Sequence, residues 1–171
     1  MSLFSWSVNM IKGTFKADVA YAHCDIPCGI YDPHLAQVAA HTVVRMHMLI
    51  NELEKPGPDA TAEQSAIYAH RIARLTIVKE EHAELAKREI RILWGDYFKP
   101  EHLEQYPDLH NTFWKAMQSG SQARQHRNMD VAQDLLAATQ EIAEIFWKTK
   151  GATPLRQPSR QTSGGEIVYP S

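Results

Sequence analysis

The sequence predicts an all-α protein, an up-and-down four-helix bundle. Apolar residues recur with helical spacing in four stretches, which proline, glycine or polar segments separate. No stretch reads as a confident β-strand. At 171 residues the chain suits one domain with tails. We expect the bundle to span residues 32–150.

The first two predicted helices cover residues 32–55 and 61–94. Asp32 is an N-cap acid followed by a proline at the first helical position, and a Pro-Gly-Pro sequence ends this helix. Thr61 and Gln64 have the spacing of a capping box. The second helix is long for a globular protein, which favours a bundle.

The last two predicted helices cover about residues 108–119 and 128–150. Between the second and third helices we expect a loop rich in aromatic residues, GDYFKPEHLEQYP. Residues 120–128 are polar and are expected to form a loop. Residues 151–171 are rich in Pro, Ser, Gly and Gln, and we expect this tail to be disordered.

Composition narrows the possible classes of function. A formal net charge of −2 gives no electrostatic reason to expect nucleic acid or an anionic membrane as a partner. The sequence has no run of about 18 apolar residues that could span a bilayer. Two cysteines are too few for a disulfide-stapled secreted scaffold. Reduced thiols favour a cytoplasmic location.

Residues 1–22 make a poor export signal, because polar residues interrupt the apolar ones and the lysines come late. Ala20-Tyr21-Ala22 has the small-x-small pattern that processing peptidases accept. A removable leader is one interpretation of the segment. A disordered or loosely packed tail is the other.

The segment HCDIPCGIY, residues 23–31, holds both cysteines of the chain. Pro27 and Gly29 favour a turn that can bring the sulfurs of Cys24 and Cys28 together. The segment could be a loop without a role, or a redox-active thiol pair. A structural zinc site is a third interpretation, but it requires a fourth ligand from elsewhere.

A fourth interpretation uses the backbone of a processed chain. Cleavage after Ala22 would make His23 the first residue, with a free α-amine. This amine, the backbone amide of Cys24 and the thiolates of Cys24 and Cys28 can form a planar N2S2 set, which suits Ni(II) or Cu(II). The imidazole of His23 can then act as a fifth, axial ligand.

The sequence HCDIPCGIYDP resembles the nickel-binding hook of nickel superoxide dismutases. The stretches KEEHAELAKREI, LWGDYFKPEHLEQYPDLH and IFWKTK are similar to the helical body of that family, so the resemblance covers residues 23–150. It implies a four-helix bundle with an N-terminal metal-binding hook and assembly into a homohexamer. It also implies that a dedicated peptidase removes residues 1–22 as a propeptide.

The resemblance implies an antioxidant oxidoreductase that converts superoxide to O2 and H2O2 by Ni(II)/Ni(III) cycling. The nickel ligands would be His23, Cys24 and Cys28. In the precursor the nitrogen of His23 is a peptide amide, so it could not act as an amine ligand. Removal of the leader would therefore switch the enzyme on.

Four further residues receive roles from the resemblance. Tyr31 would lie over the nickel pocket and hydrogen-bond small anions or water, and Tyr97 is similar to a second tyrosine near that pocket. A packed loop aromatic is the alternative for Tyr97. Asp25 would order the hook and help supply protons. Lys99 would steer superoxide, or be an ordinary solvated lysine.

The sequence departs from the family at two positions. Family members often hold the axial imidazole through a glutamate of the first helix that is paired with an arginine of the second. The matching positions here are Ala39 and His82. His82 is then a simple core histidine, or else His82 or His41 contacts the His23 ring by another route.

Two other classes of function compete with the dismutase. The hook could belong to a non-catalytic module that binds nickel, copper or zinc. A helical interaction protein with a thiol switch at Cys24 and Cys28 is the other alternative. Nickel binding without superoxide consumption, or reversible disulfide formation without metal, would distinguish them.

Overall fold

The computed structural model describes residues 29–171. The predicted leader and residues 23–28 of the hook lie outside this range. In the described part no helix is long and apolar enough to cross a membrane. The elements are α2 (His34–Glu52), α3 (Ala62–Ile92), the π-helical turn η1 (Leu93–Tyr97), α4 (Pro100–Gln105), α5 (Leu109–Gln125), α6 (Met129–Thr149), β1 (Pro154–Pro158) and β2 (Glu166–Pro170).

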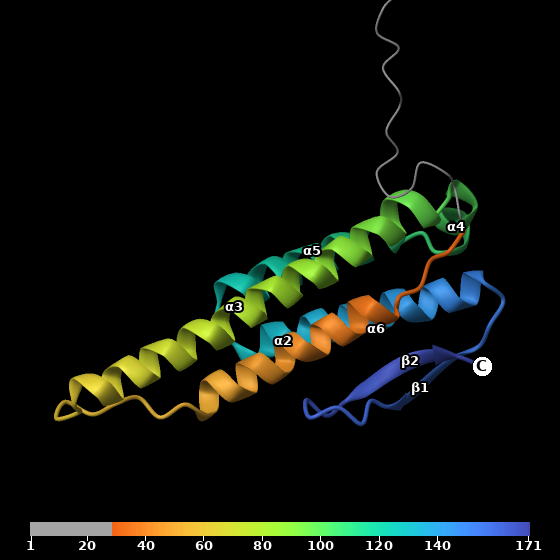
Figure 1. Cartoon of the computed structure of the whole chain (residues 1–171). Helices are drawn as coiled ribbons and strands as arrows, with labels where there is room; N and C mark the ends of the chain where they lie inside the picture. Colours follow the sequence, from red (N-terminus) through yellow and green to blue (C-terminus); the bar gives the residue numbers. More distant parts are fainter. Residues whose placement is uncertain (1–28) are drawn as a thin grey trace, which may run out of the picture.

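The four long helices form the bundle (Figure 1). Helix α2 packs against α3 and α6, and α5 packs against the same two helices, so the four close into a ring. Helices that follow one another along the chain are also neighbours in space. The predicted all-α bundle is confirmed.

Side chains bond N–H groups at the starts of the first two long helices, although α2 begins at His34 with Pro33 rather than Asp32 as its N-cap. The His34 N–H donates to the Asp32 carboxylate at 2.6 Å at the start of α2. At the start of α3 the Gln64 N–H donates to the Thr61 hydroxyl at 3.2 Å, and the Thr61 N–H donates to the Gln64 side chain at 2.9 Å. These bonds satisfy N–H groups that the helices themselves leave unpaired.

The third helix is longer than predicted. Helix α5 continues to Gln125 through residues expected to form a loop. Gly120 lies inside this helix, where α3 passes close by. A Cβ atom at position 120 would be 2.6 Å from Cγ of Lys87. The ammonium of Lys87 then donates to the hydroxyl of Ser121 at 2.8 Å. The glycine therefore permits a close contact between α3 and α5 rather than ending the helix.

The aromatic loop expected between the second and third helices is largely helical. It contains the end of η1 and all of α4, and Pro100 is the first residue of α4. Proline suits this position because the first N–H groups of a helix have no intrahelical partner. The segment closes the end of the bundle at which α3 ends and α5 begins (Figure 1).

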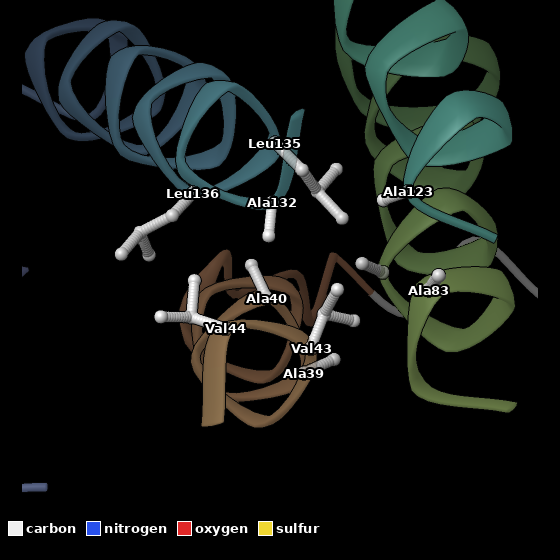
Figure 2. Packing of buried hydrophobic residues seen from close by; sticks show 10 residues of the cluster. Ala39, Ala40, Val43, Val44, Ala83, Ala123, Ala132, Leu135 and Leu136 are labelled. Carbon is white, nitrogen blue, oxygen red and sulfur yellow. The ribbon is translucent and has the colours of Figure 1, made fainter. Parts of the chain in front are cut away.

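Small aliphatic side chains fill the middle of the bundle. We call this set the alanine-rich cluster, and Figure 2 shows that it is contributed by all four long helices. Alanines allow helices to approach one another closely. The members of the cluster are Ala39, Ala40, Val43, Val44, Ala83, Ala86, Ala123, Ala132, Leu135 and Leu136.

Larger side chains fill the end of the bundle nearest to the hook. We call this set the aromatic cluster. It lies where α2 and α5 begin and where α3 and α6 end. Its buried members are Ala36, Ile90, Leu93, Leu109, Phe113, Ala116, Ile142 and Phe146, and half-buried rings including Tyr31, Trp94, Tyr97, Phe98 and Trp147 pack against them.

The expectation of a disordered tail is wrong. Strands β1 and β2 form an antiparallel hairpin that packs on α2 and α6 (Figure 1). Ile167 and Val168 are each only 1% exposed. The tail has few apolar residues, but those of β2 find a surface on the bundle that composition alone does not reveal.

Polar side chains of α2 fix the position of the hairpin. The Gln37 amide donates to the Val168 carbonyl at 3.1 Å and accepts from the Val168 N–H at 2.8 Å, as a neighbouring strand would. His41 Nε2 donates to the Glu166 carbonyl at 2.9 Å, and His41 Nδ1 lies 2.9 Å from the Ser163 hydroxyl. Burial lowers the pKa of His41, with the bond to Glu166 acting in the opposite direction.

The outer edge of β1 carries prolines where a third strand would need N–H groups. The Ser159 N–H donates to the Gly165 carbonyl, and hydrogen-bonded pairs alternate along an antiparallel ladder. Pro154, Arg156 and Pro158 therefore have their backbone groups on the outer side. Two of these three positions lack an N–H group.

Candidate metal centre

The predicted nickel ligands His23, Cys24 and Cys28 lie outside the described residues, as does Asp25. Among residues 29–171 no group of three or more His, Cys, Asp and Glu side chains could hold a metal ion. Both cysteines of the chain belong to the hook. The described body of the protein therefore offers no alternative metal site to the donor set proposed from the sequence.

The described end of the hook meets the bundle at the aromatic cluster. Gly29 has φ +70°, a conformation that glycine adopts without strain. Tyr31 is half-buried and packs against the aromatic cluster, and Pro33 is buried at the start of α2. The described residues of the hook, 29–31, thus join the bundle beside these rings.

The structure brings together the two tyrosines that the sequence analysis selected. The ring centroids of Tyr31 and Tyr97 are 5.5 Å apart, with an angle of 55° between the ring planes. Tyr97 reaches this position because it is the last residue of η1, which folds the chain across the end of the bundle. A π-helical turn often occurs at a functional site.

Other aromatic side chains surround the ring of Tyr97. Its centroid lies 4.6 Å from that of Phe146, 5.0 Å from that of Phe98 and 5.6 Å from that of His102, which stacks on it. Several contacts of this kind hold a ring in one orientation. Tyr97 is therefore a packed aromatic that also lies next to the hook.

The last residue of α6 and the residue after it supply a polar and a charged group to Tyr97. The hydroxyl oxygens of Tyr97 and Thr149 are 2.7 Å apart. The ammonium of Lys150 lies 5.1 Å from the centroid of the Tyr97 ring and 5.7 Å from that of Phe146. A cation at this distance interacts favourably with the face of an aromatic ring.

Sequence reasoning did not assign roles to Thr149, Lys150 or His102. Thr149 and Lys150 belong to the stretch IFWKTK, which carried the family resemblance without any individual function. Lys99, the cation that was selected, is exposed. No local pattern indicates that the end of α6 meets η1.

The two positions that depart from the family have neighbours within the bundle. Ala39 is fully buried in the alanine-rich cluster. His82 is half-buried, and its Nδ1 donates to the Val78 carbonyl of its own helix at 2.8 Å. His41 uses both ring nitrogens to hold the C-terminal hairpin, so it is not available to a hook imidazole.

Two ionisable side chains with shifted pKa values hold α3 and α5 together. Burial lowers the pKa of Lys79, against the opposing charge of Glu80, and the Lys79 ammonium donates to the carbonyls of Arg124 and His126. A hydrogen bond from Arg91 of the same helix lowers the pKa of Glu84, and the Glu84 carboxylate also accepts from the Arg124 guanidinium of α5 at 2.8 Å. These shifts reflect the packing of the bundle rather than the chemistry of the hook.

Fold and sequence together define a small helical-bundle protein whose two cysteines lie in the segment before α2. The family model for nickel-containing superoxide dismutase matches residues 18–150. The chain belongs to this family, which makes it an oxidoreductase with nickel as its metal. The C-terminal hairpin lies beyond the matched residues.

Individual relatives agree with this family. The chain is 37% identical to "Superoxide dismutase [Ni]" of Streptomyces coelicolor over 131 residues, which cover 77% of this chain and 90% of the relative. It is 39% identical to the protein of the same name from Streptomyces seoulensis, with the same coverage. A solved native structure of nickel superoxide dismutase is similar with a TM-score of 0.64 and 36% identity, covering 75% of this chain and 99% of that one.

Proposed function

We propose that this chain dismutates superoxide at a nickel ion held by His23, Cys24 and Cys28 after residues 1–22 have been removed. One observation carries the proposal most strongly. The segment that holds both cysteines joins a bundle of the nickel superoxide dismutase family, at the end where Tyr31 and Tyr97 meet. The balanced reaction is 2 O2•− + 2 H+ → O2 + H2O2.

The donor set fits nickel on chemical grounds. A processed chain offers the α-amine and imidazole of His23, the amide nitrogen of Cys24 and the thiolates of Cys24 and Cys28. Nitrogen donors in a planar arrangement suit Ni(II), and anionic thiolates stabilise a higher oxidation state. When bound, nickel would supply one-electron cycling between Ni(II) and Ni(III).

The protein's own residues would control access and protons. Tyr31 would cover the metal pocket and hydrogen-bond small anions or water, while Asp25 would order the hook and help to deliver protons. Tyr97 would support the ring of Tyr31, in accord with their 5.5 Å separation. The surrounding rings would limit the volume that a substrate could occupy.

Processing would act as the switch. While residues 1–22 are attached, the nitrogen of His23 is a peptide amide and cannot serve as an amine ligand. A processing peptidase would create that ligand by cleaving after Ala22. The uncut chain would then bind nickel weakly and lack dismutase activity.

We also propose that the protein is cytoplasmic and assembles as a homo-oligomer, a hexamer by analogy with the family. Helix α3 supports the oligomer. None of residues 62–78 is buried, and Ile67 and Ile77 are 54% and 56% exposed. This half of α3 extends beyond the ends of α5 and α6 (Figure 1). A helix of this kind gains stability when another subunit covers its apolar side chains.

The proposal is tested by producing the chain together with nickel and its processing peptidase. Intact mass, metal content and superoxide consumption are then measured on the same sample. We expect a chain that begins at His23, one nickel per subunit and dismutation, with light scattering giving the mass of the oligomer. A double variant with Cys24→Ser and Cys28→Ser is the matched control.

Two results would favour the competing functions. A processed chain that binds nickel, copper or zinc stoichiometrically without consuming superoxide would be a non-catalytic metal-binding module. A processed chain that takes up no metal and forms a reversible Cys24–Cys28 disulfide would be a thiol switch.

A further inference from the structure

Two short contacts meet at the hydroxyl oxygen of Thr149. This oxygen lies 2.7 Å from the hydroxyl oxygen of Tyr97 and 2.7 Å from the backbone carbonyl oxygen of Phe146. A threonine hydroxyl has one hydrogen to donate, and a carbonyl oxygen can only accept. Both contacts are hydrogen bonds only if Thr149 donates to Phe146 and Tyr97 donates to Thr149.

This arrangement determines where the single hydroxyl hydrogen of Tyr97 points. Threonine in the last turn of a helix commonly bonds a carbonyl of the preceding turn, so its bond to Phe146 is expected locally. The ring of Tyr97 is held by Phe146, by stacked His102 and by the Lys150 ammonium above its face. The phenol oxygen cannot move away from α6 without disturbing these contacts.

We propose that Thr149 is a positioning residue that directs the hydroxyl hydrogen of Tyr97 toward α6. On its side away from α6, Tyr97 then presents oxygen lone pairs only, and it donates no hydrogen bond to an anion bound there. This inference rests on the proposed function, because it assumes that superoxide binds beside Tyr97. In this arrangement Tyr97 packs against its neighbours and can accept hydrogen bonds. It does not act as a hydroxyl that binds the anion.

The first test needs neither nickel nor activity. Full-length metal-free protein is labelled with 13C at the Cζ atoms of tyrosine, and the Tyr97 resonance is assigned by its absence in Tyr97→Phe. A phenol that donates a hydrogen bond has a Cζ resonance shifted toward that of phenolate. We expect this shift in the wild type and in Thr149→Ser, and its loss in Thr149→Val.

The second test uses processed, nickel-loaded protein and azide as a small monoanionic inhibitor. In Thr149→Val the hydroxyl hydrogen of Tyr97 is released, so we expect azide to inhibit about fivefold more tightly, the effect of one added hydrogen bond of about 1 kcal/mol. Thr149→Ser should match the wild type. Tyr97→Phe should also leave azide inhibition within about twofold, because the native hydroxyl donates nothing to the anion.

Either of two results would overturn the inference. One is an unchanged Tyr97 Cζ resonance in Thr149→Val protein whose thermal unfolding shows that it remains folded. The other is a Tyr97→Phe variant that weakens azide inhibition as strongly as loss of a direct hydrogen bond would. If the resonances behave as expected but no processed protein consumes superoxide, the proposed function fails while the assignment of the hydrogen stands.

Discussion

The alanine-rich cluster and the aromatic cluster are built on different principles within one bundle. The first contains only Ala, Val and Leu as its buried members, and it brings the four helices close together (Figure 2). The second contains Phe113 and Phe146 with half-buried Tyr and Trp rings around them. One cluster sets the spacing of the helices, and the other forms the surface beside the hook.

The difference between the clusters shows which part of the bundle can take part in chemistry. Small side chains leave no polar atoms in the alanine-rich cluster, so it can only hold the helices. Tyr and Trp combine apolar rings with O–H and N–H groups, as in the 2.8 Å bond from Trp94 Nε1 to His110 Nδ1. The aromatic cluster can therefore support chemistry at its margin.

The largest expected effect comes from the aromatic cluster. Phe113 is completely buried and stacks on Trp94 with an angle of 6° between the rings. We expect Phe113→Ala to lower the free energy of unfolding by about 3–5 kcal/mol, since it leaves a cavity. Urea unfolding followed by circular dichroism measures this change.

The adjacent residue supplies the control. Trp114 is 59% exposed, so Trp114→Ala should change the free energy of unfolding by no more than about 0.5 kcal/mol in the isolated chain. Equal losses for the two variants would contradict the assignment of Phe113 to the core.

In the alanine-rich cluster we expect the opposite cause of lost stability, a side chain too large for the space between the helices. Ala83 is completely buried on α3, and Ala83→Leu would force atoms into a contact between helices. We expect a loss of about 1–3 kcal/mol, measured by thermal and urea unfolding. Ala73→Leu, at an exposed position of the same helix, should be nearly neutral.

An effect of similar size but more local is expected at the hairpin. Gln37→Ala removes the partner of both backbone groups of Val168, which stays buried. We expect a loss of about 1–3 kcal/mol, with faster hydrogen exchange at the amide of Val168. Gln157→Ala, at an exposed position of β1, should leave this exchange rate unchanged.

The smallest expected effect is a change in how the free energy of unfolding depends on pH. It involves His41 at the hairpin and neither of the two clusters. The pKa of His41 is lower in the folded than in the unfolded state, so protonation favours unfolding. This contribution to stability is complete above the ordinary value of 6.5 and is lost as the pH falls through the folded pKa. We expect unfolding free energies measured from pH 8 down to pH 5 to fall less steeply in His41→Gln. An identical pH dependence in the two proteins would contradict a buried, neutral His41.

Helices were predictable from the sequence where local signals determined them. The capping box of Thr61 and Gln64 and the helical stripe of α6 gave ends within two residues of those observed. Gly120 misled the prediction because its role depends on Lys87, a side chain from another helix. Ile167 and Val168 in the tail likewise become buried only against α2 and α6, a tertiary effect that composition does not contain.

Of the residues predicted for the candidate site, the structure describes Tyr31, Tyr97 and Lys99, and the metal ligands stay a prediction. The family resemblance indicated Tyr31 and Tyr97, and their ring centroids lie 5.5 Å apart. The contacts of Thr149 and Lys150 with Tyr97 could not be predicted, because they depend on how η1 crosses the end of α6. Contacts of this kind between distant segments are specified by packing rather than by any local pattern.

The closed edges of the hairpin have a consequence for how the protein behaves when it is concentrated. An exposed strand edge can template cross-β growth between chains. Here Gln37 occupies one edge, and Pro154 and Pro158 interrupt the other. The C-terminal hairpin therefore adds β-structure to a helical body without an open strand edge of its own that could seed fibril formation.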